Sequence, residues 1–443
     1  MNRITPDLLS DSVDPVTEYR FETFSPALTD GAPDRRTDHY MQAVIAGFHG
    51  KRPTDERLVH RVENAITDGR KLTAVYADRA PSHALSAEIP VATFAHFEKR
   101  MNVGGGRLVP AHLITWITVR PTHRRRGLLR SLMTSDLTQA KADGYPFAAL
   151  TATEGGIYTR FGFGTATWFT EVEVDTSPGF ALASEADRRV EMCPASALEE
   201  LAPAIYARFL QASPGAMERQ QLYTDVAAGS VDPRTDDEDR SVRAALHYDE
   251  SGEPDGYVSY RFHGETYYTG TVELLDFVAV SDAAYSALWA FLGAVDLVNT
   301  VKFGYAAQNS PLPWLLTDPR RAKTVGQHDG VWLRMLDVVA ALEARPWEVP
   351  GELVIKVIDP MHLAEGTYRV TADGTDAEVE RVSASVPVDL ELGVSELGSI
   401  YLGGADPVIL ARAGRIVQHT EGAALRARSM FALERAPYSP NDF

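Results

Sequence analysis

The chain has 443 residues, of which 44% are hydrophobic and 23% charged, a composition typical of globular rather than disordered or fibrous proteins. At about 150 residues per domain, this length predicts roughly three domains. The 43 Lys and Arg against 61 Asp and Glu give a net charge of −18, which argues against a nucleic-acid partner and favours cationic ones. The single cysteine, Cys193, excludes an intrachain disulfide and a cysteine-based zinc site.

The beginning of the chain has no apolar core, and we expect residues 1–18 to form a flexible extension. No later stretch approaches the ~18 uncharged apolar residues of a membrane span. The sequence therefore predicts a cytoplasmic protein with no membrane partner.

Residues 19–168 are expected to form the first domain, built around a strand–turn–helix–strand unit. The apolar and β-branched run His112–Val119 predicts a strand, and the charged turn Arg120–Gly127 follows it directly. An amphipathic helix is expected over Leu128–Ala142, with Gly144 at its C-terminal end and a returning strand at Phe147–Thr153. This order is one βαβ unit. Upstream, the sequence predicts strands at Tyr19–Phe24, Lys71–Ala77 and Ile89–Phe97, and helices at Asp38–Phe48 and Thr54–Asp68.

Residues 169–330 contain a diverged copy of the same unit. Leu274–Val280 imitates its strand, Tyr285–Asn299 its helix and Val301–Tyr305 its returning strand. The turn of this copy, Ser281–Tyr285, has neither an arginine run nor a glycine. We therefore expect the central domain to have lost its ligand loop.

Residues 331–443 show a different pattern of predicted elements from the two preceding domains, and this pattern predicts an α+β third domain. Short strands with turns are expected at Gly351–Ile358, Gly366–Ala372 and Ala377–Ser385, followed by Leu397–Tyr401 and a helical Pro407–Ala413.

The arginine run Arg124–Gly127 lies where the first amides of the following helix have no internal partner. A pyrophosphate there would accept backbone N–H bonds, with Gly127 allowing close approach and the arginines adding charge-assisted bonds. The alternative is a solvated arginine surface. The strand–turn–helix setting favours the phosphate site.

Several strings in the sequence resemble known acetyltransferases. Arg124-Arg-Arg-Gly127-Leu-Leu129 resembles the Arg-x-x-Gly-x-(Gly/Ala) signature of GNAT N-acetyltransferases, departing from it at Leu129. The string Tyr158-Thr-Arg-Phe-Gly-Phe163 resembles the family's tyrosine followed by Gly-Phe. From about Tyr19 onward, the chain is similar to the Eis-type (enhanced intracellular survival) acetyltransferases, on the strings Val119–Arg130, Gly144–Pro146, Thr153–Gly164 and Trp332–Val338.

The resemblance implies tandem GNAT folds, the first active and the central one degenerate, and a sterol-carrier-like α+β domain at the C-terminus. The first strand of that last domain would join the N-terminal domain, and its tail would reach the active site. Acetyl-CoA would be the co-substrate, with no metal, and the chain would form a homo-hexamer. The implied reaction is direct acetyl transfer to primary amines of aminoglycoside-like polyamines or lysine side chains. The alternatives are a protein lysine acetyltransferase and a non-catalytic lipid or small-molecule binding protein on a GNAT scaffold.

The resemblance also implies roles for individual residues. Coenzyme contacts fall on Ile117, Val119, Arg124, Arg125, Gly127, Leu128 and Thr153. Tyr158 would be the general acid, because a tyrosine of pKa ~10 can share a proton with a departing thiol of ~8.5.

The reaction also requires a base, because amines of pKa ~8–10 are mostly protonated at neutral pH. By resemblance this base is the terminal carboxylate of Phe443, with Glu154 as the rival. Asp442, next to that carboxylate, and Phe48 are expected to contact the acceptor. The twelve histidines show no metal-binding spacing, so no metal site is predicted.

Overall fold

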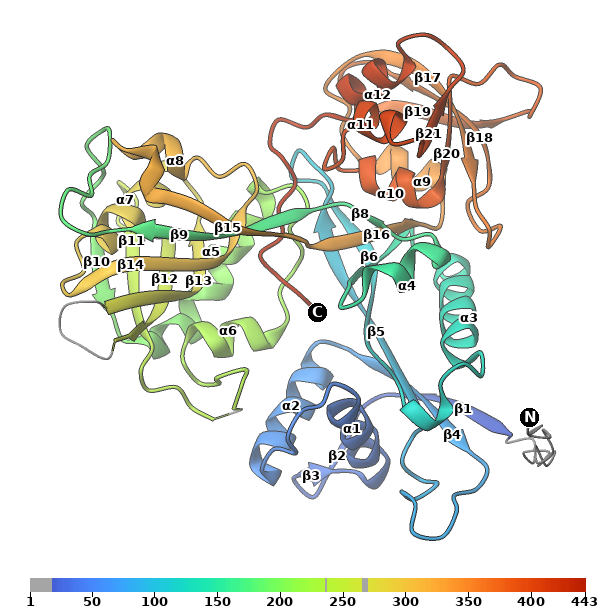
Figure 1. The fold of residues 1–443 in the computed structure, drawn as a ribbon, viewed down its shortest axis with the longest axis horizontal. Helices are drawn as coiled ribbons and strands as arrows, with labels where there is room; N and C mark the ends of the chain where they lie inside the picture. The colour runs from blue at the N-terminus through green and yellow to red at the C-terminus, as the bar shows by residue number, and fades with distance from the viewer. Residues whose placement is uncertain (1–17, 236, 265–269) are drawn as a thin grey trace, which may run out of the picture.

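Three β-sheets with covering helices make up the computed structural model, which describes residues 18–235, 237–264 and 270–443 (Figure 1). Apart from residue 18, the expected N-terminal extension lies outside the described residues. Within the described residues, the structure has no helix long and apolar enough to cross a membrane.

The first domain is built on a seven-stranded sheet of order β1-β4-β5-β6-β7-β16-β8. Its strands are β1 (Tyr19–Phe24), β4 (Lys71–Ala77), β5 (Ala92–Asn102), β6 (Leu108–Val119), β7 (Phe147–Thr151), β8 (Gly164–Thr165) and β16 (Val331–Met335). A small hairpin of β2 (Leu28–Thr29) and β3 (Ala32–Pro33) stands apart, and the helices are α1 (Arg35–Gly47), α2 (Asp55–Thr67), α3 (Leu128–Ala142) and α4 (Gly155–Tyr158). Helix α2 begins where the sequence predicts, because the Thr54 hydroxyl accepts the Arg57 amide.

The central domain carries a second seven-stranded sheet, of order β10-β11-β12-β13-β14-β9-β15. Its strands are β9 (Trp168–Asp175), β10 (Val190–Cys193), β11 (Arg243–Tyr248), β12 (Pro254–His263), β13 (Gly270–Ala279), β14 (Val298–Ala307) and β15 (Ala322–Asp329). Its helices are α5 (Leu198–Ala212), α6 (Gln221–Ala227), α7 (Asp282–Gly293) and α8 (Leu312–Leu315).

The C-terminal domain has a five-stranded sheet of order β19-β18-β17-β20-β21. Its strands are β17 (Gly351–Ile358), β18 (Gly366–Ala372), β19 (Ala377–Val382), β20 (Leu390–Gly393) and β21 (Ile416–Gln418), and its helices are α9 (Val338–Ala344), α10 (Val394–Ile400), α11 (Pro407–Arg412) and α12 (Ala423–Phe431). The run Leu397–Tyr401 thus belongs to a helix rather than to a strand. Val394, Leu397 and Tyr401 are buried and spaced as on one face of a helix. The sequence analysis did not recognise this spacing.

The chain passes from the first sheet to the second between β8 and β9, and it returns between β15 and β16. Strand β16, which follows the central domain in sequence, lies between β7 and β8, and β9 lies between β14 and β15 (Figure 1). The segment between β8 and β9 passes the segment between β15 and β16 at Thr167, whose hydroxyl accepts the Val331 amide at 2.8 Å. A Cβ on Gly330 would lie 2.6 Å from that hydroxyl, so this close approach requires glycine. The first sheet therefore includes a strand that follows the central domain in sequence.

A buried ion pair joins the C-terminal domain to strand β16 of the first sheet. Arg334, on β16, donates to the Asp359 carboxylate at 2.8 Å, and both side chains are fully buried. Asp359 also accepts the amides of Leu363 and Ala364 at 2.9 and 2.8 Å. Burial alone raises the pKa of Asp359, but Arg334 and the backbone donors outweigh it and hold that pKa below its ordinary value.

Removing one partner of this pair will destabilise the protein. Asp359→Ala leaves a buried guanidinium uncompensated, so we expect the free energy of unfolding to fall by about 3–5 kcal/mol in urea denaturation. As a control, Glu380→Gln breaks the exposed pair between Arg369 and Glu380 and should cost less than about 1 kcal/mol. Equal losses in the two variants would contradict this role of Asp359.

Candidate active site

Strands β6 and β7 run parallel but separate after two paired positions. His112 pairs with Ala148 and Leu113 with Ala149, after which β6 continues toward Val119 without β7. A bulge in β6 sets Trp116 and Ile117 opposite the single residue Phe94. Trp116 adopts a left-handed φ of +52°, and its carbonyl accepts the Thr93 hydroxyl at 2.8 Å. The edge of β6 that faces away from β5 is therefore available to an extended ligand with amide groups.

The arginine run follows this splayed strand directly. Arg124, Arg125 and Gly127 are exposed, and α3 starts at Leu128 without a capping side chain from the described residues. The φ of Gly127 is +81°, and an added Cβ would meet nothing within 4 Å, so conformation rather than crowding favours glycine. The open helix start and exposed guanidinium groups fit a pyrophosphate.

The central copy of this unit lacks such an opening. The Ser281 hydroxyl caps α7 by accepting the Ala284 amide at 3.0 Å, and it donates to the Asp255 carboxylate at 2.6 Å. Asp255 is buried and pairs with His247 at 2.5 Å. A carboxylate beside an already capped helix start repels an anion, so the start of α7, as the described residues show it, does not suit a phosphate.

Tyr158 lies on the same side of the sheet as the arginine turn. It ends α4, is 8% exposed and packs in one hydrophobic cluster with Leu128, against which Ile117 and Val119 also pack. Burial, together with the nearby Glu154 carboxylate, raises the pKa of Tyr158 above its ordinary value of 10. The structure thus gathers Tyr158 with the residues predicted to follow the coenzyme.

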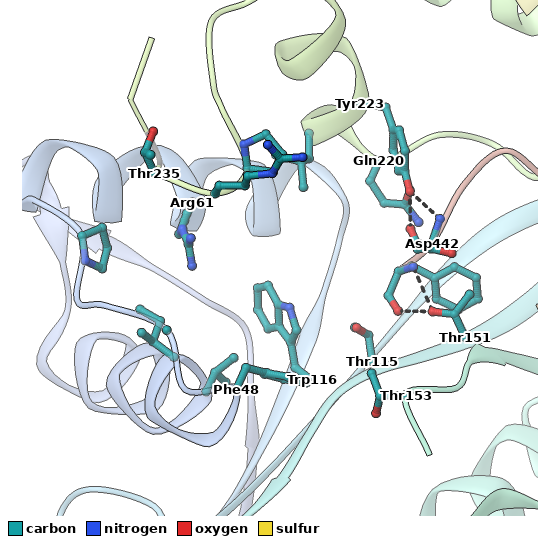
Figure 2. A pocket seen from close by; sticks show the side chains of 18 of the residues that line it. Phe48, Arg61, Thr115, Trp116, Thr151, Thr153, Gln220, Tyr223, Thr235 and Asp442 are labelled. Carbon is teal, nitrogen blue, oxygen red and sulfur yellow. Dashed lines mark hydrogen bonds between the residues drawn. The ribbon is translucent and has the colours of Figure 1, made fainter. Parts of the chain in front are cut away.

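A second group of predicted residues lines a cavity of about 1100 Å³ between the first two domains, here called the junction cavity. Its walls come from α1 and α2, from strands β6, β7, β9 and β15, from residues 220–235 with Asp237, and from the C-terminal tail. The predicted site residues in its lining are Phe48, Thr153, Asp442 and Phe443 (Figure 2). Phe48 is 49% exposed, so it is not a core aromatic. Tyr158 and Glu154 are not among the lining residues.

The C-terminal tail is anchored on the central domain before it reaches the cavity. Asn441 is buried, its side-chain oxygen accepts from Arg219 at 2.9 Å, and its amide donates to the Tyr206 hydroxyl at 2.7 Å. Arg219 is itself held by Asp276, whose two oxygens accept at 2.5 and 2.8 Å. A fully bonded buried network of this kind fixes the position of the tail.

The last residue of the tail binds the end of β7. The Thr151 hydroxyl donates to the terminal carboxylate of Phe443 at 2.8 Å and accepts the Phe443 amide at 3.2 Å (Figure 2). The Phe443 ring packs edge-on against Phe97, with 6.0 Å between ring centroids. The carboxylate consequently lies at the mouth of the gap between β6 and β7.

Asp442 faces the central domain. Its carboxylate accepts the Tyr305 hydroxyl at 2.6 Å, and its backbone carbonyl accepts the Tyr223 hydroxyl at 2.9 Å. Burial raises the pKa of Asp442, the hydrogen bond from Tyr305 opposes this only in part, and Asp329 adds to the rise.

Sequence reasoning missed two groups of polar residues. The tail anchor of Arg219, Asp276 and Asn441 is spread over some 220 positions, and the sequence holds no motif that links them. The same is true of His96, His112 and Asp136, whose side-chain nitrogen and oxygen atoms lie within 4.8 Å of one another. Asp136 faces both rings, at 2.8 Å from His96 and 2.7 Å from His112.

Each of the three domains matches a known protein family. Residues 31–166 and 215–335 each match an acetyltransferase (GNAT) domain, and residues 338–440 match a sterol carrier protein domain. An uncharacterized N-acetyltransferase of Streptomyces griseus is 34% identical over 414 residues, which cover 91% of this chain and 96% of the relative. The N-acetyltransferase Eis of Mycobacterium tuberculosis is 38% identical over 340 residues, covering 72% of this chain and 78% of Eis.

The chain belongs to the Eis family of GNAT N-acetyltransferases. A crystal structure of Eis1 from Mycobacterium abscessus superposes with a TM-score of 0.78 at 28% identity, over 97% of this chain and 100% of Eis1. A GCN5-related N-acetyltransferase from Anabaena variabilis shares the fold, with a TM-score of 0.76 at 19% identity, over 96% of this chain and 100% of that one. The predicted family, the enzyme class and the fold class of two GNAT domains plus a sterol-carrier-like domain are confirmed. The GNAT fold implies acetyl-CoA as co-substrate and an amine as acceptor.

Proposed function

We propose that this Eis-family enzyme transfers acetyl from acetyl-CoA directly to a primary amine that enters through the junction cavity. The acceptors to be tested first are aminoglycoside-like polyamines and lysine side chains, by family resemblance. The same resemblance supports a cytoplasmic homo-hexamer. Ile117, Val119, Arg124, Arg125, Gly127 and Leu128 would hold the coenzyme, on the open side of β6 and at the start of α3, with Thr153 beside it.

The observation that carries this proposal is the position of the Phe443 carboxylate. It is held by Thr151 in the lining of the junction cavity, at the gap between β6 and β7 through which an acetyl group would be presented. Glu154 is exposed and lies outside that lining, which favours Phe443 as the base. Asp442 and Phe48 would contact the acceptor from the same cavity.

In the proposed reaction the amine nitrogen bonds to the acetyl carbon while the carbon–sulfur bond breaks. The acceptor's ammonium first loses one proton to the Phe443 carboxylate, which passes it to solvent, and the proton that the amine loses after attack takes the same route. The departing sulfur receives a proton from Tyr158. Because burial keeps the pKa of Tyr158 above 10, its hydroxyl stays protonated at neutral pH and is ready to donate. Solvent returns the first proton to Tyr158.

Thiol release tests the function itself. Acetyl-CoA incubated with the protein and a panel of amines should yield free coenzyme A thiol with at least one primary amine, and mass spectrometry should find one acetyl group on that amine. Silence across a broad panel of aminoglycosides, polyamines and lysine peptides would favour the binding-protein alternative.

Tyr158→Phe removes the proposed acid while keeping the ring. We expect kcat to fall about 10²-fold or more, the usual contribution of a positioned acid, while the Kd for coenzyme A measured by calorimetry changes little. In the wild type the alkaline decline of kcat should lie above pH 10, because the raised pKa keeps the phenol protonated below it. Unchanged turnover in the variant would remove Tyr158 from this role.

Adding Gly-Ser after Phe443 displaces the terminal carboxylate from Thr151. We expect kcat to fall at least tenfold with coenzyme binding unchanged, measured by thiol release and calorimetry. Glu154→Gln serves as the comparison and should retain most of the activity. A fully active extended protein, together with an inactive Glu154→Gln variant, would transfer the role of base to Glu154.

A further inference from the structure

Two histidines and one aspartate, His96, His112 and Asp136, lie between helix α3 and the sheet of the first domain and are here called the histidine cluster. In the register of β5 and β6, His96 is paired with Ile114, and His112 is paired with Glu98. Because residues 112 and 114 are two positions apart, both histidines point to the same face of the sheet. Asp136 reaches them from α3, whose buried side packs on this face.

The nitrogen and oxygen atoms of the histidine cluster face one another. Asp136 Oδ1 is 2.8 Å from His96 Nδ1, and its Oδ2 is 2.7 Å from His112 Nε2. One such atom from each of the three residues lies within 4.8 Å of the other two. In a tetrahedral zinc site with bonds of about 2.0–2.1 Å, the ligand atoms are about 3.4 Å apart. Side-chain shifts of about 1 Å, with no change of fold, would therefore bring the cluster to zinc-binding geometry.

His96 Nδ1 has unused bonding capacity. The atom is buried and has no hydrogen-bond partner of suitable geometry among the described residues, although the Asp136 oxygen is 2.8 Å away. A metal ion bonded to both atoms would satisfy them. The His96 side chain as a whole is 27% exposed, against 10% for Asp136 and 5% for His112. An ion can therefore reach the cluster from the side of His96.

The contacts within the cluster do not compete with a metal ion. Zn²⁺ binds neutral imidazole and ionised carboxylate, which are the ordinary forms of histidine and aspartate at neutral pH. When the ion binds, its bonds to His112 and Asp136 replace the hydrogen bond that now joins these two residues.

A second carboxylate stands beside the histidine cluster. Glu98 is exposed, lies directly opposite His112 in the strand register and accepts the Tyr145 hydroxyl at 2.6 Å. The ring centroids of Tyr145 and His112 are 5.3 Å apart. Side chains paired across antiparallel strands have Cβ atoms about 5 Å apart, so Glu98 adds negative charge close to the cluster. This charge attracts a cation.

We propose that the histidine cluster binds a divalent transition-metal ion, best matched by Zn²⁺, with water as the fourth ligand. Imidazole nitrogen and carboxylate oxygen are usual zinc ligands, whereas Ca²⁺ and Mg²⁺ prefer oxygen ligands alone. The bound ion joins the middle of α3 to β5 and β6. Asp136 lies eight residues, or about 12 Å, along the helix from Leu128, so the ion is separate from the arginine turn. Metal binding here does not depend on the proposed function.

Metal titration of the full chain without a polyhistidine tag tests this proposal. After treatment with EDTA and removal of the chelator, the protein should bind one equivalent of Zn²⁺ in isothermal titration calorimetry, with a Kd in the micromolar range or tighter. The ion binds only the folded state, so it should raise Tm by several degrees, and EDTA should reverse this rise. X-ray absorption at the zinc edge should show imidazole nitrogens at about 2.0–2.1 Å.

Two variants each remove one ligand with little change in size. His96→Gln and Asp136→Asn should weaken Zn²⁺ binding at least tenfold and abolish the rise in Tm. His419→Gln changes an exposed histidine outside the cluster and should retain both effects. Circular dichroism checks that each variant is folded. Because the His96 side chain is partly exposed, His96→Gln keeps the test decisive if Asp136→Asn does not fold.

Two results would overturn the proposed metal site. If the wild type binds no Zn²⁺, the three residues form only an ion-pair group that holds α3 on the sheet. If the wild type binds Zn²⁺ and both folded variants bind it equally well, the ion lies on other residues. Thiol release is measured separately, so neither result affects the proposed acetyl transfer.

Discussion

The hydrogen bonds between Thr151 and Phe443 connect residues 292 positions apart in the chain. The threonine ends strand β7 of the first domain, and the phenylalanine ends a tail that the central domain holds through Asn441. The carboxylate is therefore positioned by all three domains at once. If this carboxylate is the base, as proposed, the reaction needs no acidic side chain from the first domain, and the placement of the base depends on all three domains.

The βαβ unit of the first domain was predictable because its signals are local. Helix α3 has the predicted bounds Leu128–Ala142, since its apolar spacing and the glycine before it determine where it begins. Strand β7 ends at Thr151, two residues earlier than expected, because α4 begins soon afterwards. Helix α10 was overlooked because its buried positions, spaced as in a helix, occupy fewer than two turns. A short element has too few residues to distinguish the helical period of about 3.6 residues from the strand period of about 2.

The site was only half predictable, for a physical reason. The turn that we propose to bind phosphate is contiguous in sequence, so composition and spacing indicate it, whereas the junction cavity is assembled from segments between α1 and the last residue. Its lining holds both cations and carboxylates, which the net charge of −18 did not indicate. Net charge describes the average field at long range, while a cavity presents only the few groups that line it.

The position of β16 between β7 and β8 also has a consequence for biosynthesis. While the ribosome is still making the central domain, the first sheet lacks the strand between β7 and β8, and the bare edge of β7 is open to pairing with other chains. The first domain can close only after Met335 has left the exit tunnel, so the two acetyltransferase modules mature together rather than one after the other.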